Sequence, residues 1–136
     1  MAVTMLRNAF ASIGAVDLSD HCVEVEIDDG VVELDNTVMS NTAENMQGGL
    51  RRWTMRFTLL QDYAAGKTHE TLRPLINTNV ALIVRKDAGV VSGTNPQWNG
   101  SGFFSRYAPI KGPVGQLQRV VAEFKNAGSS LTYATA

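Results

Sequence analysis

Residues 50–60 read LRRWTMRFTLL and carry a clear signal of secondary structure. Large apolar side chains alternate with polar ones at a period of two, which is typical of a strand with one buried face. The apolar set is Trp53, Met55, Phe57 and Leu59, and the polar set is Arg52, Thr54, Arg56 and Thr58. The alternation predicts a long strand that packs Trp53 and its companions into a core.

The same period appears upstream, where residues 23–28 read VEVEID. A strand here would bury Val23, Val25 and Ile27 and turn its acidic side chains to the other face. The dipeptide Asp29-Gly30 that follows is a two-residue hairpin signal. It predicts a tight turn, with residues 31–35 returning as the paired strand.

Further strands are predicted over residues 8–13, 80–85, 101–108 and 117–124. One segment has helical spacing instead: Thr68 is a candidate N-cap, and Leu72, Leu75 and Ile76 follow on one face. Pro74 limits this helix to two or three turns. The set predicts one mainly β domain over residues 1–136, a β-sandwich or partly open barrel with one flanking α-helix.

Two polar segments are predicted to lie outside the core. Residues 36–49 form a long loop, and loops of that length in compact domains are usually functional or disordered. Residues 128–136 are small and polar, which predicts a flexible C-terminal arm. We expect Trp98 to lie in an exposed loop over residues 89–102.

The composition excludes several functions. The chain has 136 residues and one cysteine. Its net charge is −1, so it lacks the basic excess of a nucleic-acid-binding protein. We expect neither a signal peptide nor a membrane-spanning helix, because the apolar runs are only a few residues long. His21 and His69 lack metal-ligand spacing, and no phosphate loop or nucleophile motif is present. The sequence therefore predicts no enzyme, no cofactor and no metal.

Charge is unevenly distributed along the chain. Residues 8–50 hold most of the acids and no Lys or Arg, whereas every base except Arg7 lies from residue 51 onward. One interpretation is a solvated acidic hairpin. Another is self-association, since acidic and basic patches on one subunit complement each other between copies. A third is an acidic wall past which a polyanion slides without binding.

Several short motifs occur in order along nearly the whole chain. They are IGAVDLSDH at 13–21, GLRRWTMRF at 49–57, QDYAAG at 61–66, LRPL at 72–75, VSGTNP at 91–96 and GPVG at 112–115. Together they resemble the small tail tube proteins of siphophage-like bacteriophages. Arg73 stands where that family often has an aromatic residue, and residues 132–136 keep only part of the usual ending.

The resemblance implies a β-sandwich with one helix, of which six copies close into a ring whose inner sheets line a lumen. Stacked rings would form the conduit for DNA, which would pass without specific binding. The implied partners are further copies of the chain and the terminator, tape measure and baseplate proteins, with no membrane. The implied location is the virion tail, after synthesis in the host cytoplasm.

Site residues follow from the charge pattern and the resemblance. The candidates for the lumen are Glu24, Glu26, Asp28, Glu33 and Asp35. The candidates for contacts between subunits are Asn36, Thr37, Met39, Asn41, Glu44, Met46, Arg51, Arg52 and Arg56. The alternatives are a tail terminator, a neck protein or a capsid decoration protein. A carbohydrate-binding module that uses Trp53 or Trp98 is a further alternative.

Overall fold

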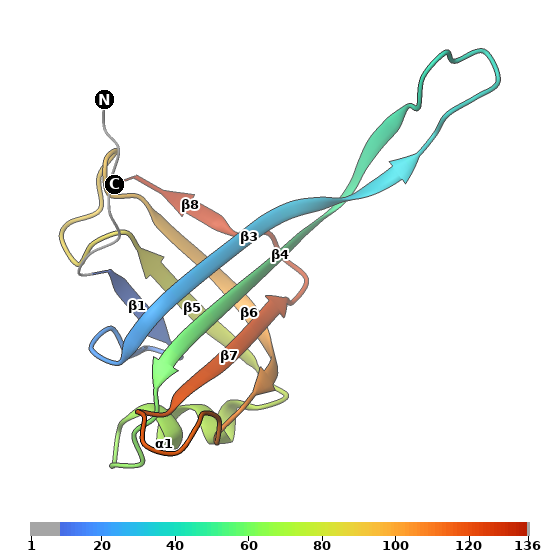
Figure 1. Ribbon diagram of the computed structural model, residues 1–136. Coiled ribbons are helices and arrows are strands. Elements are labelled where there is room, and N and C mark those ends of the chain that lie inside the picture. Colours follow the sequence, from blue (N-terminus) through green and yellow to red (C-terminus); the bar gives the residue numbers. More distant parts are fainter. Residues whose placement is uncertain (1–8, 136) are drawn as a thin grey trace.

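The computed structural model describes residues 9–135 and shows a mainly β protein built on one antiparallel sheet (Figure 1). The strands are β1 (Phe10–Ile13), β2 (Val16–Asp17), β3 (Cys22–Asp35), β4 (Met46–Leu60), β5 (Asn79–Arg85), β6 (Gln97–Tyr107), β7 (Arg119–Asn126) and β8 (Thr132–Ala134). Their order across the sheet is β2-β1-β5-β6-β7-β4-β3, and β8 pairs with β6. The predicted fold class is confirmed. Asn8 of the predicted first strand lies outside the described residues.

The sheet curls so that its two ends approach each other without pairing. Val25 and Ile27 on β3 line a hollow together with Val84 on β5 and Trp98 on β6. In Figure 1, β3 and β4 cross in front of β5 and β6. A single sheet that folds over its own core in this way is a partly open barrel, the second of the two predicted architectures.

Aromatic side chains fill the barrel. Phe124 packs against Phe57 and Phe104, with ring centroids 5.7 and 4.5 Å apart. Trp53 is fully buried, as predicted, and its Nε1–H donates to the Ser129 carbonyl at 2.9 Å. The indole lies against β6 at Gly102, where an added Cβ would come within 3.1 Å of the Trp53 ring. The core therefore depends on a large residue on β4 facing a residue without a side chain on β6.

The predicted turn at Asp29-Gly30 is wrong. Strand β3 continues through Gly30, which lies opposite Arg52, and ends only at Asp35 opposite Met46. A hairpin signal acts only if its two flanking segments pair with each other. Here both pair with β4, because β4 begins at Met46 and offers a longer ladder. The connecting loop is accordingly residues 36–45, shorter than the predicted 36–49.

The prediction that Val23 faces the core is wrong, because β3 contains a β-bulge at this position. Between Cys22 and Glu24, β3 advances two residues while β4 advances from Leu59 to Thr58. The extra residue breaks the alternation. Cys22 consequently packs against the core and Val23 is exposed, whereas Val25 and Ile27 keep their predicted inward face.

The flanking helix is short, as predicted, but begins differently. It consists of α1 (Thr68–Leu72) followed by the 3₁₀ turn η1 (Arg73–Leu75), and Lys67 rather than Thr68 is the N-cap. Thr68 is buried, and its hydroxyl donates to the Leu60 carbonyl at 3.0 Å. Ile76 lies beyond the helix and is exposed. Within residues 9–135, no helix has the length and apolar character needed to cross a membrane.

Strand β8, near the end of the described residues, pairs with β6, contrary to the prediction of a flexible arm. Within the segment predicted as a flexible arm, residues 128–136, Thr132–Ala134 pair with Gln97–Asn99 of β6, and Leu131 packs against the core. Ala136 lies outside the described residues. Trp98 is also not in a loop: it lies in β6, half-buried, with its ring centroid 5.3 Å from that of Tyr133.

Candidate assembly interface

A two-stranded arm, residues 31–52, projects from the barrel (Figure 1). It consists of the end of β3, the turn 36–45 and the beginning of β4, and all of its residues are exposed. Strand β7 pairs with β4 only over residues 54–60, so the arm has no third strand. At a rise of roughly 3.3 Å per residue, its paired part alone extends about 15 Å.

The turn of the arm is held by its own polar side chains. The Asn36 N–H donates to the Asn45 carbonyl at 3.0 Å, and the Asn45 N–H donates to Thr37 Oγ1 at 2.8 Å. The Val38 N–H donates to Asn41 Oδ1 at 2.8 Å. Three of the predicted contact residues, Asn36, Thr37 and Asn41, therefore shape the turn. Met39 is left fully exposed.

The arm displays more apolar surface than a free hairpin should. Its exposed apolar residues are Val31, Val32, Leu34, Val38, Met39, Met46 and Leu50. A two-stranded hairpin is marginally stable alone in water, and exposed apolar patches of this kind mark interaction sites. The barrel does not cover these side chains, so a partner molecule must do so if they are to be buried.

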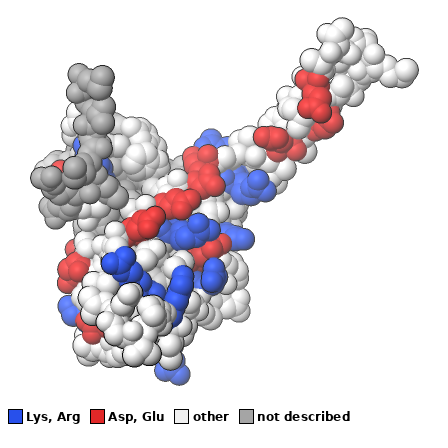
Figure 2. Space-filling view, in the orientation of Figure 1, with Lys and Arg blue, Asp and Glu red and all other residues white. Residues whose placement is uncertain are grey.

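An acidic row runs along β3 beside a basic band on the neighbouring strands (Figure 2). All five lumen candidates, Glu24, Glu26, Asp28, Glu33 and Asp35, are exposed. Of these, only Glu26 forms an ion pair among residues 9–135, with Arg56 at 3.4 Å. Hydrogen bonds from the side chain and backbone of Thr37 lower the pKa of Asp35. The other four acids of the row have no basic partner within ion-pair distance among residues 9–135.

The candidate arginines are partly engaged within the chain. Arg56 also approaches Glu123 at 3.4 Å, and Arg51 pairs with Asp29 at 2.8 Å. Arg52 is exposed and forms no ion pair within the part of the chain that the structure describes. Exposed pairs of this kind contribute at most about 1 kcal/mol. They therefore hold the arginine side chains in place only weakly.

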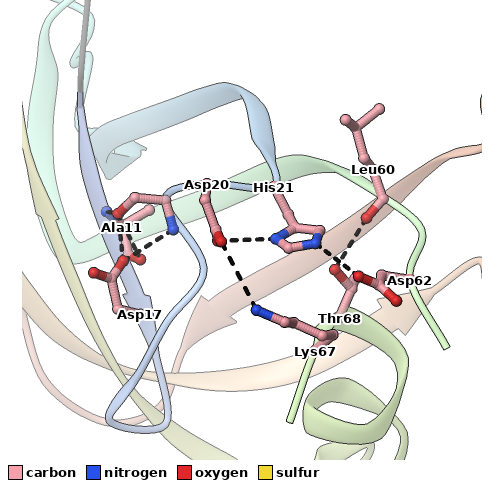
Figure 3. Close-up of polar contacts among 9 residues, drawn as sticks. Ala11, Asp17, Asp20, His21, Leu60, Asp62, Lys67 and Thr68 are labelled. Atoms are coloured by element: carbon pink, nitrogen blue, oxygen red, sulfur yellow. Dashed lines mark hydrogen bonds and ion pairs between the residues drawn. The ribbon is translucent and has the colours of Figure 1, made fainter. Parts of the chain in front are cut away.

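Sequence reasoning missed a polar clasp formed by Asp20, His21, Asp62 and Lys67 (Figure 3). His21 Nδ1 lies 2.8 Å from Asp20 and Nε2 lies 2.9 Å from Asp62, while Lys67 Nζ is 3.9 Å from Asp20. The clasp joins the turn before β3 to the segment between β4 and α1. Asp62 is distant in sequence, so only the fold could reveal its pairing with His21.

Protonation controls the strength of the clasp. Hydrogen bonds to Asp20 and then to Asp62 raise the pKa of His21 above its ordinary 6.5. The contribution of protonated His21 to stability is fully present below its ordinary pKa of 6.5. It is lost as the pH rises through the raised pKa of the folded state. The pKa of Asp20 is lowered, mainly by its bond with His21, so its contribution is lost only as the pH falls through that lowered value. The clasp is therefore strongest in mildly acidic solution.

We expect His21→Gln to destabilise the protein by about 0.5–1 kcal/mol near pH 5.5 and by less near pH 8.5. Urea unfolding at the two pH values measures the difference. His69→Gln is the matched control, because His69 contacts the Tyr107 hydroxyl at 2.9 Å rather than a carboxylate. Equal losses at both pH values for His21→Gln would contradict the charged clasp.

Two features of the described residues bear on metal binding and on cysteine chemistry. Within residues 9–135, no three His, Cys, Asp or Glu side chains lie close enough together to hold a metal ion. Burial raises the pKa of the Cys22 thiol, so it stays protonated at neutral pH, unlike a reactive cysteine.

The fold is shared with chains of gene transfer agent particles. A chain of the virion of a native gene transfer agent particle superposes with a TM-score of 0.71 at 13% identity, covering 97% of this chain and 99% of that one. A chain of the tail of an empty gene transfer agent particle, a structure with C6 symmetry, gives a TM-score of 0.62 at 14% identity, covering 84% of this chain and 82% of that one.

The SPP1 Dit protein, described as a hub of the adsorption apparatus of phages that infect Gram-positive bacteria, gives a TM-score of 0.45 at 13% identity. That match covers 90% of this chain and 51% of the Dit chain. No protein-family model and no curated protein sequence matches the chain. The two gene transfer agent matches, at 13% and 14% identity, establish the fold alone, a curled mainly β sheet with one short helix.

Proposed function

We propose that the chain is a structural subunit of a phage-like tail, and specifically of the tail tube. The observation that carries the proposal is the arm, a hairpin whose apolar side chains are not covered by their own barrel. A subunit that functions alone gains nothing from such a projection, whereas a subunit of an assembly buries it in a neighbour. The shared fold with chains of a virion and of a tail supports the same proposal.

Ring closure would use the free edges of the sheet. Strand β3 lies at the end of the strand order, so one side of Cys22–Asp35 carries unpaired backbone N–H and C=O groups. A long free edge of this kind readily pairs with another chain. The other edge of the arm, on β4 before residue 54, is free as well. We propose rings of six copies, following the C6 symmetry of the similar tail structure.

The acidic row on β3 would face the lumen. Glu24, Glu26, Asp28, Glu33 and Asp35 would then present carboxylates to passing DNA, and like charge would keep the phosphates from adhering. The proposed partners are other copies of the chain and, at the ends of the tube, the terminator, tape measure and baseplate proteins. The proposed location is the tail of the virion, with synthesis in the host cytoplasm.

Reversing charge in this row tests the lumen assignment. Glu24→Lys combined with Glu26→Lys should change the free energy of unfolding by no more than about 1 kcal/mol, because both side chains are exposed. It should weaken ring assembly or make the assembled tubes retain DNA. Sedimentation and a DNA retention assay measure the two effects.

The matched control is Glu24→Gln with Glu26→Gln, which removes the same charges without reversing them and should give a weaker effect. A lysine variant that assembles normally and does not retain DNA would refute the lumen assignment. It would leave the tube proposal standing.

Sedimentation velocity over a range of concentrations tests the tube proposal itself. A tube subunit adds copies without a limit, because its contacts are head to tail. We therefore expect species that grow steadily in size above a threshold concentration. Growth that stops at one ring would instead indicate a terminator or neck protein, and a monomer or trimer would indicate a decoration protein. A monomer that binds sugar through Trp98 would indicate a carbohydrate-binding module.

A further inference from the structure

The opening of the barrel holds two hollows that meet at Val25. The first extends from residues 9–11, at β1, to residues 22–25 at the beginning of β3. The second lies between Val25 and Ile27 of β3 and Trp98 of β6. In Figure 1 the beginning of β3 lies beside β1 at the left of the barrel. Because no strand bridges this opening, Val25 and Ile27 face the core and yet are only half-buried.

A buried donor without an acceptor lies at the second hollow. Arg85, at the end of β5, lines this hollow, and its guanidinium lies 4.1 Å above the centre of the Phe10 ring. Its Nη1 donates to Gln97 Oε1 at 3.3 Å, whereas its Nε is buried and forms no hydrogen bond within residues 9–135. A buried N–H without a partner is costly. An occupant that fits the hollow therefore supplies a hydrogen-bond acceptor as well as apolar side chains.

The first hollow is acidic. Asp17, Asp20 and Glu24 line it, and no Lys or Arg does. Asp20 pairs with His21 at 2.8 Å. Glu24 has no basic partner within ion-pair distance in the part of the chain that the structure describes. An occupant that spans both hollows should therefore carry a positive charge near its apolar side chains.

The N-terminal segment, residues 1–8, has this chemistry and is joined to the barrel at the opening. It reads MAVTMLRN, and Arg7 is the only Lys or Arg before residue 51. Ala9 already lines the first hollow, and Phe10 lies opposite Arg85 in the β1–β5 ladder. Eight residues extend over roughly 26 Å, well beyond the roughly 10 Å that one inserted strand bridges between its neighbours.

We propose that the N-terminal segment crosses the opening of its own barrel between β1 and β3 and covers both hollows. Its apolar side chains lie against Trp98. Arg7 lies beside Glu24, and a backbone carbonyl of the segment accepts the hydrogen bond from Arg85 Nε. The segment thereby closes the barrel and shields the core from water. The contact lies within one chain, so the inference does not depend on the proposed tube function.

Fluorescence quenching and urea unfolding at low protein concentration test the cover. Trp53 is fully buried, so acrylamide reaches Trp98 more readily. Combining Val3→Ser, Met5→Ser and Leu6→Ser should increase the quenching of Trp98. The same variant should raise the equilibrium constant for unfolding by about tenfold or more, because burial of even one large apolar side chain contributes that much.

The matched control is Val38→Ser combined with Met39→Ser, which makes the same kind of change at exposed apolar residues of the arm. It should alter neither the quenching of Trp98 nor the unfolding equilibrium. Wild-type quenching and stability in the variant of the N-terminal segment would overturn the proposal.

Charge reversal tests the position of Arg7. Arg7→Glu should raise the equilibrium constant for unfolding by roughly two- to fivefold at low salt, the range of a single exposed ion pair. Adding Glu24→Lys should restore most of the loss. Adding Glu33→Lys instead, on the arm, should restore none of it. Equal effects of the two lysine substitutions would overturn the pairing of Arg7 with Glu24.

Disulfide trapping shows whether the contact lies within one chain. Met5→Cys and Val25→Cys are combined in a Cys22→Ala chain and oxidised far below the concentration needed for assembly. We expect a disulfide within the monomer, detected by peptide mass analysis. The control pair, Met5→Cys with Val114→Cys, should form none, because Val114 is exposed in the loop between β6 and β7. Covalent dimers from the first pair would overturn the proposal, since the segment would then reach another subunit.

The cover and the tube function fail separately. Every measurement of the cover is made on the monomer, so a chain that forms no tubes can still show a closed barrel. A chain that forms tubes while quenching, stability and cross-linking show no contact of the N-terminal segment would overturn the cover and leave the tube function standing.

Discussion

Replacing residues 32–50 with the dipeptide Asn-Gly is expected to abolish assembly while leaving the barrel folded. The change removes most of the arm and joins Val31 to Arg51, which lie opposite each other in the β3–β4 ladder, by a two-residue turn. Every deleted residue is exposed, so the loss of folding stability should be no more than about 1 kcal/mol. Sedimentation should show a monomer well above the concentration at which the wild-type chain assembles.

Urea unfolding and circular dichroism of the shortened chain serve as the folding control. An unchanged unfolding midpoint together with lost assembly would locate the association energy in the arm. Assembly at the wild-type concentration would contradict the proposal that the arm joins subunits, because no other described segment projects from the barrel in this way (Figure 1).

The second large effect is expected at the centre of the core. Trp53→Ala should lower the free energy of unfolding by about 3–5 kcal/mol. The substitution empties the space above Gly100 and Gly102 on β6 and removes the hydrogen bond to the Ser129 carbonyl. Because small domains are stable by only about 5–15 kcal/mol, much of this variant should be unfolded in mild denaturant. Urea unfolding followed by circular dichroism measures the loss.

Two control variants separate packing from the hydrogen bond. Trp53→Phe keeps an aromatic ring but loses the Nε1 donor, so we expect a smaller loss of roughly 1–2 kcal/mol. Trp98→Ala should also cost less than Trp53→Ala, because Trp98, near the beginning of β6, is only half-buried at the margin of the core. A loss for Trp98→Ala equal to that for Trp53→Ala would contradict the location of the core.

The structure of residues 50–60 could be predicted from the sequence, because the apolar residues that recur there at a period of two are also the buried ones. Trp53, Met55, Phe57 and Leu59 are all fully buried, as their spacing predicts. Alternation is local information, and a side chain that points into a core obeys it wherever the strand lies in the sheet. The mainly β class and the short helix near Thr68 could be predicted for the same reason.

Pairing and register could not be predicted in this way. Asp29-Gly30 has the composition of a turn, yet both of its flanks pair with β4, because the β3–β4 ladder runs on to Asp35. Val23 fits the alternation of its strand, yet the bulge beside Cys22 turns it outward. Both outcomes depend on the partner strand, whose identity is a property of the whole sheet.

In the candidate interface, the acidic residues could be predicted from the sequence, whereas their partners could not. The excess of acids before residue 50 was visible in the sequence, and the structure gathers Glu24, Glu26 and Asp28 on one exposed strand. The partners were not visible: Arg56 meets both Glu26 and Glu123, and His21 meets Asp62. Long-range pairs leave no local pattern, so the clasp appears only when the fold is known.

Electron microscopy of the purified full chain at high concentration tests the proposed tube function. We expect long hollow tubes with a regular axial repeat and six-fold symmetry in cross-section. Isolated rings that never stack, or featureless monomers at every concentration, would contradict it.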